Sequence, residues 1–202
     1  MSKEGILIII SGPSGSGKGT VVSKLVEDED FSLSISATTR KPRDYEQNGI
    51  HYFFHTKDEF EIMKKNGDLL EWAEFCDNYY GTPKYYVENC LKLGKNVILE
   101  IEVQGAFQIK SIIPESVLIF LTAPNIKELE NRLNNRGTEN NDVIKKRIKR
   151  AIEEMEFVNK YDYIIINNTI DESVENIKSI VKAESMKVSK NKNIYKIFKG
   201  EI

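Results

Sequence analysis

Several features are scarce or absent in this 202-residue sequence, and each absence narrows the class of protein. Two cysteines, Cys76 and Cys90, are too few for a disulfide framework. No segment approaches the roughly 20 apolar residues of a membrane span, and the first apolar run is too short for the core of a signal peptide. Neither sign of charge dominates, because 29 basic residues face 31 acidic ones. We therefore expect a cytoplasmic globular protein that binds neither nucleic acid nor membranes.

The apolar residues that are present form short continuous runs separated by helical patterns. Such runs are typical of strands buried on both faces, and they occur at Ile6–Ile10, Val97–Ile101, Val117–Leu121 and Tyr163–Ile166. Helical spacing appears near residues 84–93, 125–135, 141–158 and 171–185. The alternation predicts an α/β fold with a mostly parallel sheet flanked by helices.

Two stretches depart from this alternation. Residues 34–83 are rich in hydroxyl and aromatic side chains and predict a small strand-rich insertion with one short helix near 57–66. The segment around 132–150 is basic and polar, which indicates a mobile flap. Residues 185–202 are rich in Lys and Asn, and we expect a loosely docked tail after a single domain at 5–184.

A glycine-rich segment directly follows the first predicted strand and opens the first predicted helix. It reads Gly12-Pro13-Ser14-Gly15-Ser16-Gly17-Lys18-Gly19-Thr20. Glycines let backbone amides point inward around phosphate oxygens, and the lysine can reach the β- and γ-phosphates. The alternative, a glycine-rich turn with an unrelated lysine, is disfavoured by the strand before it and the helix after it. The segment predicts a nucleoside-triphosphate site.

The residue after the lysine is Gly19, where this kind of loop usually has Ser or Thr. Thr20 follows one place later. We therefore expect any hydroxyl contact to Mg²⁺ to come from Thr20, directly or through water.

The predicted insertion concentrates groups that suit a phosphate and a base. Arg40 and Arg43 can each present a bidentate fork to phosphate oxygens, and Ser36 and Tyr52 add hydroxyls. Further along, Glu71 offers a carboxylate, which can accept from the adjacent N1–H and N2–H₂ donors of guanine. The hydroxyl of Thr82 can donate to guanine O6, whereas adenine lacks this pattern.

At this point the chain resembles the guanylate kinase family, which transfers a phosphoryl group from ATP to GMP. The resemblance rests on GPSGSGKGT, SATTRKPRDYEQNGIHYFF, LLEWAEF, NYYGTP, ILEIEVQGA and RLNNRGTENNDVIKKRI, in family order. It implies a P-loop kinase core (about 5–33, 84–125 and 159–184), a GMP-binding insertion (34–83) and a helical lid (126–158), with Mg²⁺ as cofactor. By this resemblance the GMP phosphate would be held by Ser36, Arg40, Arg43, Tyr52 and Tyr80. Glu71 and Thr82 would read the guanine.

Two positions differ from family members in which Ser or Asp is found. Thr82 replaces Ser and keeps a hydroxyl, and Glu100 replaces Asp. Glu100 and Glu102 are expected on one face of the strand that ends near Ile101, where parallel strands present ligand sites. Glu100 could support GMP or its arginines, or contact Mg²⁺ through water, and the sequence leaves these roles open.

The basic flap supplies further positive charge for phosphoryl transfer. A stripe of apolar residues predicts one buried face of a helix: Ile144, Ile148, Ala151, Ile152 and Met155. Helical spacing places Arg147 nearer the cleft than Arg150, and the resemblance favours Arg136 and Arg147 as catalytic residues with Lys18 and Arg43. For Arg132 and Arg150, a position on an ordinary solvated helix face is as well supported as a role at the transferring phosphate. Arginine clusters without a ligand would repel, so we expect an open lid that closes on nucleotides.

Other functions remain open at this stage. The same fold occurs in protein-interaction modules that bind phosphopeptides, although these typically lack the phosphate loop or lid arginines. A kinase for AMP or dTMP is a nearer rival, and the pairing of Glu71 with Thr82 argues against AMP. Asn167 and Asn168 could contact adenine or form a simple turn. The expected partners are ATP and GMP, with the use of deoxy-GMP and the oligomeric state left open.

Overall fold

The structure, a computed structural model, describes residues 4–135, 141–191 and 193–201. Its core is a five-stranded parallel sheet in the order β2-β7-β1-β8-β9. The strands are β1 (Leu7–Ser11), β2 (Phe31–Leu33), β7 (Asn96–Glu100), β8 (Val117–Thr122) and β9 (Tyr163–Ile166). The phosphate loop follows the carboxyl end of the central strand β1, the edge where ligands bind in open parallel sheets.

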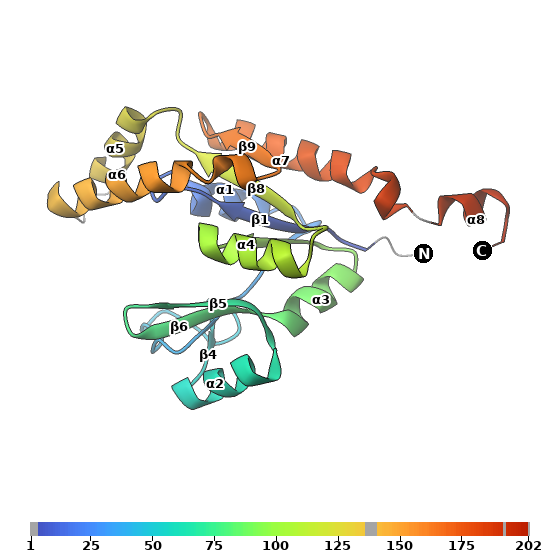
Figure 1. Cartoon of the computed structure of the whole chain (residues 1–202), viewed down its shortest axis with the longest axis horizontal. Helices are drawn as coiled ribbons and strands as arrows, with labels where there is room; N and C mark the ends of the chain where they lie inside the picture. Colours follow the sequence, from blue (N-terminus) through green and yellow to red (C-terminus); the bar gives the residue numbers. More distant parts are fainter. Residues whose placement is uncertain (1–3, 136–140, 192, 202) are drawn as a thin grey trace.

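Helices cover both faces of this sheet (Figure 1). They are α1 (Lys18–Leu25) and α7 (Ile170–Ser185) on one side, and α3 (Lys84–Lys92) and α4 (Val103–Ile112) on the other. Ile8 and Ile10 of β1 pack in the first layer, and Leu7 and Ile9 pack in the second. Because both faces of β1 are buried, its sequence is a continuous apolar run. The predicted α/β class is confirmed.

Two elements of the core were not predicted. Strand β2 has only three residues, too few for a periodic pattern. Helix α4 begins directly after Glu102, its N-cap residue. Strand β7 already ends at Glu100, so the prediction that Glu100 and Glu102 share one face of a strand is wrong.

Residues 34–83 form a second, four-stranded sheet in the order β4-β3-β6-β5, drawn below the core in Figure 1. Its elements are β3 (Ala37–Thr38), β4 (Phe53–Phe54), α2 (Lys57–Asn66), β5 (Leu69–Phe75) and β6 (Asn78–Pro83). Helix α2 starts at a capping box between Thr56 and Glu59 and ends at Gly67 in the left-handed conformation. Its buried Phe60 stacks on Tyr79 of β6 with ring centroids 5.4 Å apart.

Helices α5 (Ile126–Asn135) and α6 (Asn141–Met155) pack against each other above the phosphate loop. The predicted apolar stripe of α6 is only partly buried. Ile144 and Ala151 are buried, whereas Ile152 is 52% exposed and Met155 is 37% exposed. The prediction of one continuous buried face is therefore wrong at its C-terminal end, where Ile152 and Met155 line an open hollow.

A one-turn helix at Val158–Lys160 connects α6 to β9. After α7 the chain continues through a second one-turn helix, Val188–Lys190, to α8 (Ile194–Phe198). Helix α8 lies apart from the core (Figure 1), and its apolar side chains are exposed. In the part of the chain that the structure describes, no helix combines the length and apolar character needed to cross a membrane.

Candidate active site

The phosphate loop connects β1 to α1 through a backbone that glycine makes possible. Gly17 has φ 94°, and a Cβ added there would lie 2.5 Å from Nδ2 of Asn167. Within the described residues, no side chain caps the first amides of α1. The hydroxyl of Ser16 is fully buried and has no hydrogen-bond partner in the same part of the chain. Unpaired donors at a helix N-terminus suit a phosphate oxygen.

The predicted catalytic lysine is held at the same loop. Lys18 Nζ donates to the carbonyl oxygens of Gly12, at 2.5 Å, and Pro13, at 3.1 Å. These contacts place its positive charge at the start of the loop, beside the amides of α1. The loop therefore gathers a cation and backbone donors in one place.

Two side chains brace this loop from outside. Asn167, buried at the end of β9, donates from Nδ2 to the Ser16 carbonyl at 2.8 Å and accepts from the Ser173 hydroxyl at 3.0 Å. Arg132 of α5 donates to the carbonyls of Asn167, at 2.9 Å, and Ser16, at 3.3 Å. The solvated-face alternative for Arg132 is therefore wrong, and the Asn167 amide is occupied by the loop.

A hollow of about 320 Å³ adjoins the braced side of the loop. Its lining consists of Gly15, Gly17, Thr20, Arg132, Asn167, Asn168, Thr169 and Ile170. Thr20 thus faces the same space as the exposed Asn168. Gly19 faces the opposite way, because a Cβ added there would lie 3.8 Å from both carboxylate oxygens of Glu100.

The oxygen groups near the loop fit a magnesium ion held mainly by a nucleotide. Mg²⁺ usually takes one or two carboxylates, several waters and substrate phosphates. Glu100 offers one carboxylate beside Gly19, and desolvation raises the pKa of its carboxyl while Lys18 opposes that rise. Among the described residues, no cluster of three or more His, Cys, Asp or Glu could hold a metal on its own.

In the insertion, Arg40 is surrounded by groups that fix its orientation. Its guanidinium makes two hydrogen bonds to the Glu46 carboxylate, at 2.8 and 2.9 Å. It also lies 5.3 Å from the ring centroid of Tyr52 and 5.9 Å from that of Phe54. The repulsion that we expected among arginines without a ligand is therefore weakened at Arg40, because the Glu46 carboxylate neutralises its charge.

Other predicted phosphate ligands lie on neighbouring strands. The rings of Tyr52 and Tyr80 pack edge to face with centroids 6.2 Å apart. Ser36 immediately precedes β3, and its carbonyl accepts the Phe53 amide, so its backbone lies beside β4. Arg43 is exposed and donates to the Tyr45 hydroxyl at 3.0 Å.

The predicted guanine readers form a buried pair. The Thr82 hydroxyl donates to Oε1 of Glu71 at 2.7 Å, and both residues are buried. Burial raises the pKa of Glu71, while the hydrogen bonds from Thr82 oppose that rise. The second oxygen, Oε2, faces helix α4, where a Cβ added at Gly105 would lie 3.0 Å away. The site therefore lies at the seam between insertion and core.

The lid helix α6 contacts the core through Arg150. Its guanidinium donates to Glu102 at 2.8 Å and to Glu154 at 2.9 Å. The sequence favoured Arg147 over Arg150 for the cleft, yet Arg150 is the residue with this link to the start of α4. Arg147 is half-buried on the same helix. Arg136 lies outside the described residues.

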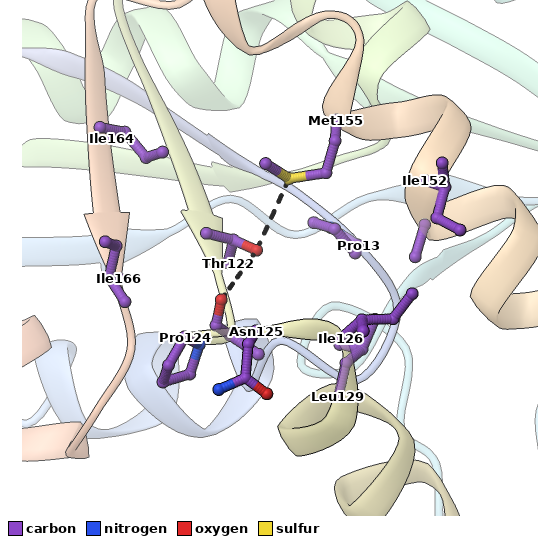
Figure 2. A pocket seen from close by; sticks show the side chains of 12 residues that line it. Pro13, Thr122, Pro124, Asn125, Ile126, Leu129, Ile152, Met155, Ile164 and Ile166 are labelled. Carbon is purple, nitrogen blue, oxygen red and sulfur yellow. Dashed lines mark hydrogen bonds between the residues drawn. The ribbon is translucent and has the colours of Figure 1, made fainter.

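Figure 2 shows an apolar hollow of about 240 Å³ where the lid helices meet the phosphate loop. Pro13 of the loop lies on one side, Ile152 and Met155 of α6 on another, and Ile164 and Ile166 of β9 on a third. The Thr122 hydroxyl contacts Sδ of Met155 at 3.7 Å. The exposed end of the predicted stripe thus lines a space beside the loop.

Three features were missed in the sequence. The ion pair of Glu46 with Arg40 could have been sought, since the carboxylate lies within the arginine-rich run. The role of Asn167 depends on a contact across 151 residues and leaves no local signal. Asn159-Lys160-Tyr161-Asp162 also matches the Asn-Lys-x-Asp pattern with which GTPases read guanine.

The structure gives that last segment a different role. The Asp162 carboxylate accepts from Lys110 Nζ at 2.8 Å and from the Leu118 amide at 2.9 Å. It precedes β9, so it lies at the amino ends of the parallel strands, opposite the edge that carries the phosphate loop. It is a structural contact of the core.

A parallel α/β core with a phosphate loop, a separate four-stranded sheet and a pair of helices beside the loop is the architecture of P-loop nucleotide kinases. The guanylate kinase family model matches residues 4–184. The chain belongs to the guanylate kinase family.

Named relatives agree with this assignment over nearly the whole chain. It is 51% identical to a guanylate kinase of Bacillus cereus, covering 96% of each chain. It is 49% identical to one of Caldanaerobacter subterraneus subsp. tengcongensis, covering 96% of this chain and 95% of the relative. The crystal structure of guanylate kinase from Anaplasma phagocytophilum is similar with a TM-score of 0.72 and 33% identity, covering 92% of this chain and 88% of that one.

Proposed function

We propose that this protein, a guanylate kinase by family, transfers the γ-phosphoryl group of ATP to GMP and releases ADP and GDP, using Mg²⁺ as cofactor. Residues 12–20 would bind ATP, the insertion (34–83) would bind GMP, and the lid (126–158) would close over both. The observation that carries the assignment of GMP is the buried Glu71–Thr82 pair.

The acceptor base fits this pair for a chemical reason. A carboxylate accepts both N1–H and N2–H₂ of guanine, and the threonine hydroxyl, whose single hydrogen points to Glu71 in the free protein, would turn to donate to O6. Adenine would present its N1 acceptor to the buried carboxylate and supply neither of these two donors. A site built around hydrogen bonds rejects a base that cannot make them far more strongly than an apolar pocket does.

The acceptor phosphate would lie against the donors of the insertion. Arg40, Arg43, Ser36, Tyr52 and Tyr80 would supply them, with the guanidinium groups as bidentate partners. Glu100, whose carboxylate lies beside Gly19 of the phosphate loop, would support either the acceptor nucleotide or a water on the metal.

Phosphoryl transfer chiefly needs alignment and positive charge. Lys18 and the amides of α1 would hold the donor phosphates, Arg43 the acceptor, and Arg136 and Arg147 the transferring group once the lid closes. Mg²⁺, when bound, would neutralise charge on the donor phosphates, and Glu100 and Thr20 would offer it oxygen ligands, directly or through water. Closure would exclude water, which otherwise competes with GMP.

An assay of ADP release with GMP, deoxy-GMP, IMP, AMP, UMP and dTMP tests the proposal. We expect GMP to give the highest kcat/KM and AMP to be a poor acceptor. Omitting Mg²⁺, or replacing Lys18 with Ala, should remove most of the transfer. Faster turnover of AMP than of GMP would refute the assignment of the acceptor.

A further inference from the structure

Glu46 occupies an unexpected place for an acidic residue, inside the group of donors assigned to the acceptor phosphate. Its side chain is only 5% exposed. Beyond Arg40, Oε2 accepts the backbone amide of Arg43 at 2.8 Å, and the Glu46 amide donates back to the Arg43 carbonyl at 2.9 Å. The carboxylate is therefore fixed by a short turn, independently of Arg40.

The contacts of Arg40 use one edge of its guanidinium. Nη1 donates to Glu46 at 2.9 Å and to the Lys41 carbonyl at 2.8 Å, while Nη2 donates once to Glu46 at 2.8 Å. A guanidinium has five N–H donors. The bonds to Glu46 and Lys41 leave Nε–H and the second hydrogen of Nη2, and the guanidinium also hydrogen-bonds the side chain of Tyr80, another predicted phosphate ligand. These two donors lie parallel on one edge, which is the geometry that matches two phosphate oxygens.

Neighbouring aromatic side chains help to hold the Arg40 guanidinium in this orientation. Tyr52 and Phe54 pack near the guanidinium, and Tyr80 also interacts with it. The Arg40 guanidinium holds the pKa of Glu46 at about 2, so the carboxylate is ionised throughout the neutral range.

We infer that Glu46 is a positioning residue for phosphate recognition: it occupies the end of the Arg40 guanidinium and so directs the Nε/Nη2 edge at the 5′-phosphate of the acceptor nucleotide. This inference rests on the proposed function. It assigns a favourable role to a negative charge that would otherwise repel the phosphate, because orientation of the fork outweighs that repulsion.

Binding of guanosine and GMP by calorimetry separates this role from a merely structural one. Guanosine engages only the base site, whereas GMP also needs Arg40. In Glu46→Gln we expect the Kd of GMP to rise about tenfold or more, because a charge-assisted fork is lost, with guanosine binding unchanged. Glu74→Gln, an exposed change on β5 of the same sheet, is the matched control and should alter neither.

A second comparison uses Arg40→Lys, since lysine has no fork to orient. Adding Glu46→Gln to Arg40→Lys should then cause no further loss of GMP affinity. Equal or tighter GMP binding in Glu46→Gln would overturn the inference, and so would a parallel loss of guanosine binding. Failure of the unaltered protein to bind GMP would instead refute the proposed function.

Discussion

The buried carboxylate of Glu71 lies in a site where charge is costly without a ligand. Thr82 supplies one hydrogen bond, and the remaining acceptor capacity faces the seam with α4. Burial raises the pKa of Glu71, so the ionised form is disfavoured in the free protein. Guanine would provide the missing donors, which means that the residue serves ligand binding at the expense of stability.

Replacing Glu71 with Gln should therefore separate function from stability. We expect kcat/KM for GMP to fall roughly tenfold to a thousandfold, because the amide presents a donor to the donors of guanine. The free energy of unfolding at neutral pH should not decrease, because a buried charge is removed. Steady-state kinetics and urea unfolding check both effects, and a destabilised variant with normal GMP kinetics would contradict the assignment.

The same residue predicts a pH dependence. The folded-state pKa of Glu71 is above its ordinary value of 4.5, so its protonation is favoured by folding. Its contribution to stability is present below pH 4.5 and is lost as pH rises through the raised pKa. The KM for GMP should rise as pH falls through that pKa.

The KM for ATP should change less over the same range. Measuring both constants from acid to neutral pH tests this. Glu71→Gln should lack the acid limb for GMP, and its persistence would assign that limb to another group.

At the scale of elements, the phosphate loop depends on β9 and α5 as well as on its own glycines. Asn167→Ala would leave the Ser173 hydroxyl without its partner, and the Ser16 carbonyl would keep only the longer bond from Arg132. A buried polar group left unsatisfied costs about 1–3 kcal/mol, so we expect a loss of that size in unfolding free energy. The KM for ATP should also increase. Asn168→Ala, at an exposed neighbour, should be stable, and equal stability of the two variants would refute the brace.

Whether a strand or helix could be predicted from the sequence depends on how deeply it is buried and how long it is. Strands β1, β7 and β8 were predicted because both of their faces are buried. Strand β9 was predicted from its continuous apolar run, but the expectation that both of its faces are buried is wrong, since Ile164 and Ile166 are 52% and 50% exposed. The three-residue β2 and the helix α4 were missed, the latter because it starts soon after a strand ends. The buried stripe of α6 was predicted to reach Met155, because periodicity shows which residues share a face and not whether neighbouring side chains fill the space beside them.

In the candidate site, too, local motifs could be predicted from the sequence, whereas contacts between distant residues could not. The phosphate loop and the Glu71–Thr82 pair could be predicted because each depends on a residue type at a local spacing or on a motif. The Asn167 brace and the Arg150–Glu102 link join residues far apart in the chain, and sequence periodicity has no information on such contacts. The roles of the site residues stay predictions until the variants are measured.

At the scale of the whole molecule, the chain after α7 contributes little to the fold. Helix α8 is exposed, and the family match ends at residue 184. A chain ending at Asn191, which caps the preceding turn through bonds to Ser185 and Lys187, should keep its activity. Its free energy of unfolding should change by less than about 0.5 kcal/mol, the scale of surface changes.

Thermal and urea unfolding of this shortened chain provide the test. A control ending at residue 180 also removes the buried Val181 and Glu184, and it should be clearly destabilised. A large loss of stability in the chain ending at Asn191 would show that the tail packs on the body.

Helix α4 approaches the predicted base site closely at Gly105, where the residue that best stabilises the helix differs from the residue that best suits guanine binding. Alanine is more favourable than glycine inside a helix by roughly 1 kcal/mol, so folding alone would favour the substitution. Its methyl group, however, would lie 3.0 Å from Oε2 of Glu71 and displace the carboxylate. If Glu71 recognises guanine, stability would favour Ala at this position and guanine recognition would favour Gly, so a residue in a helix of the core would contribute to the specificity of the acceptor site.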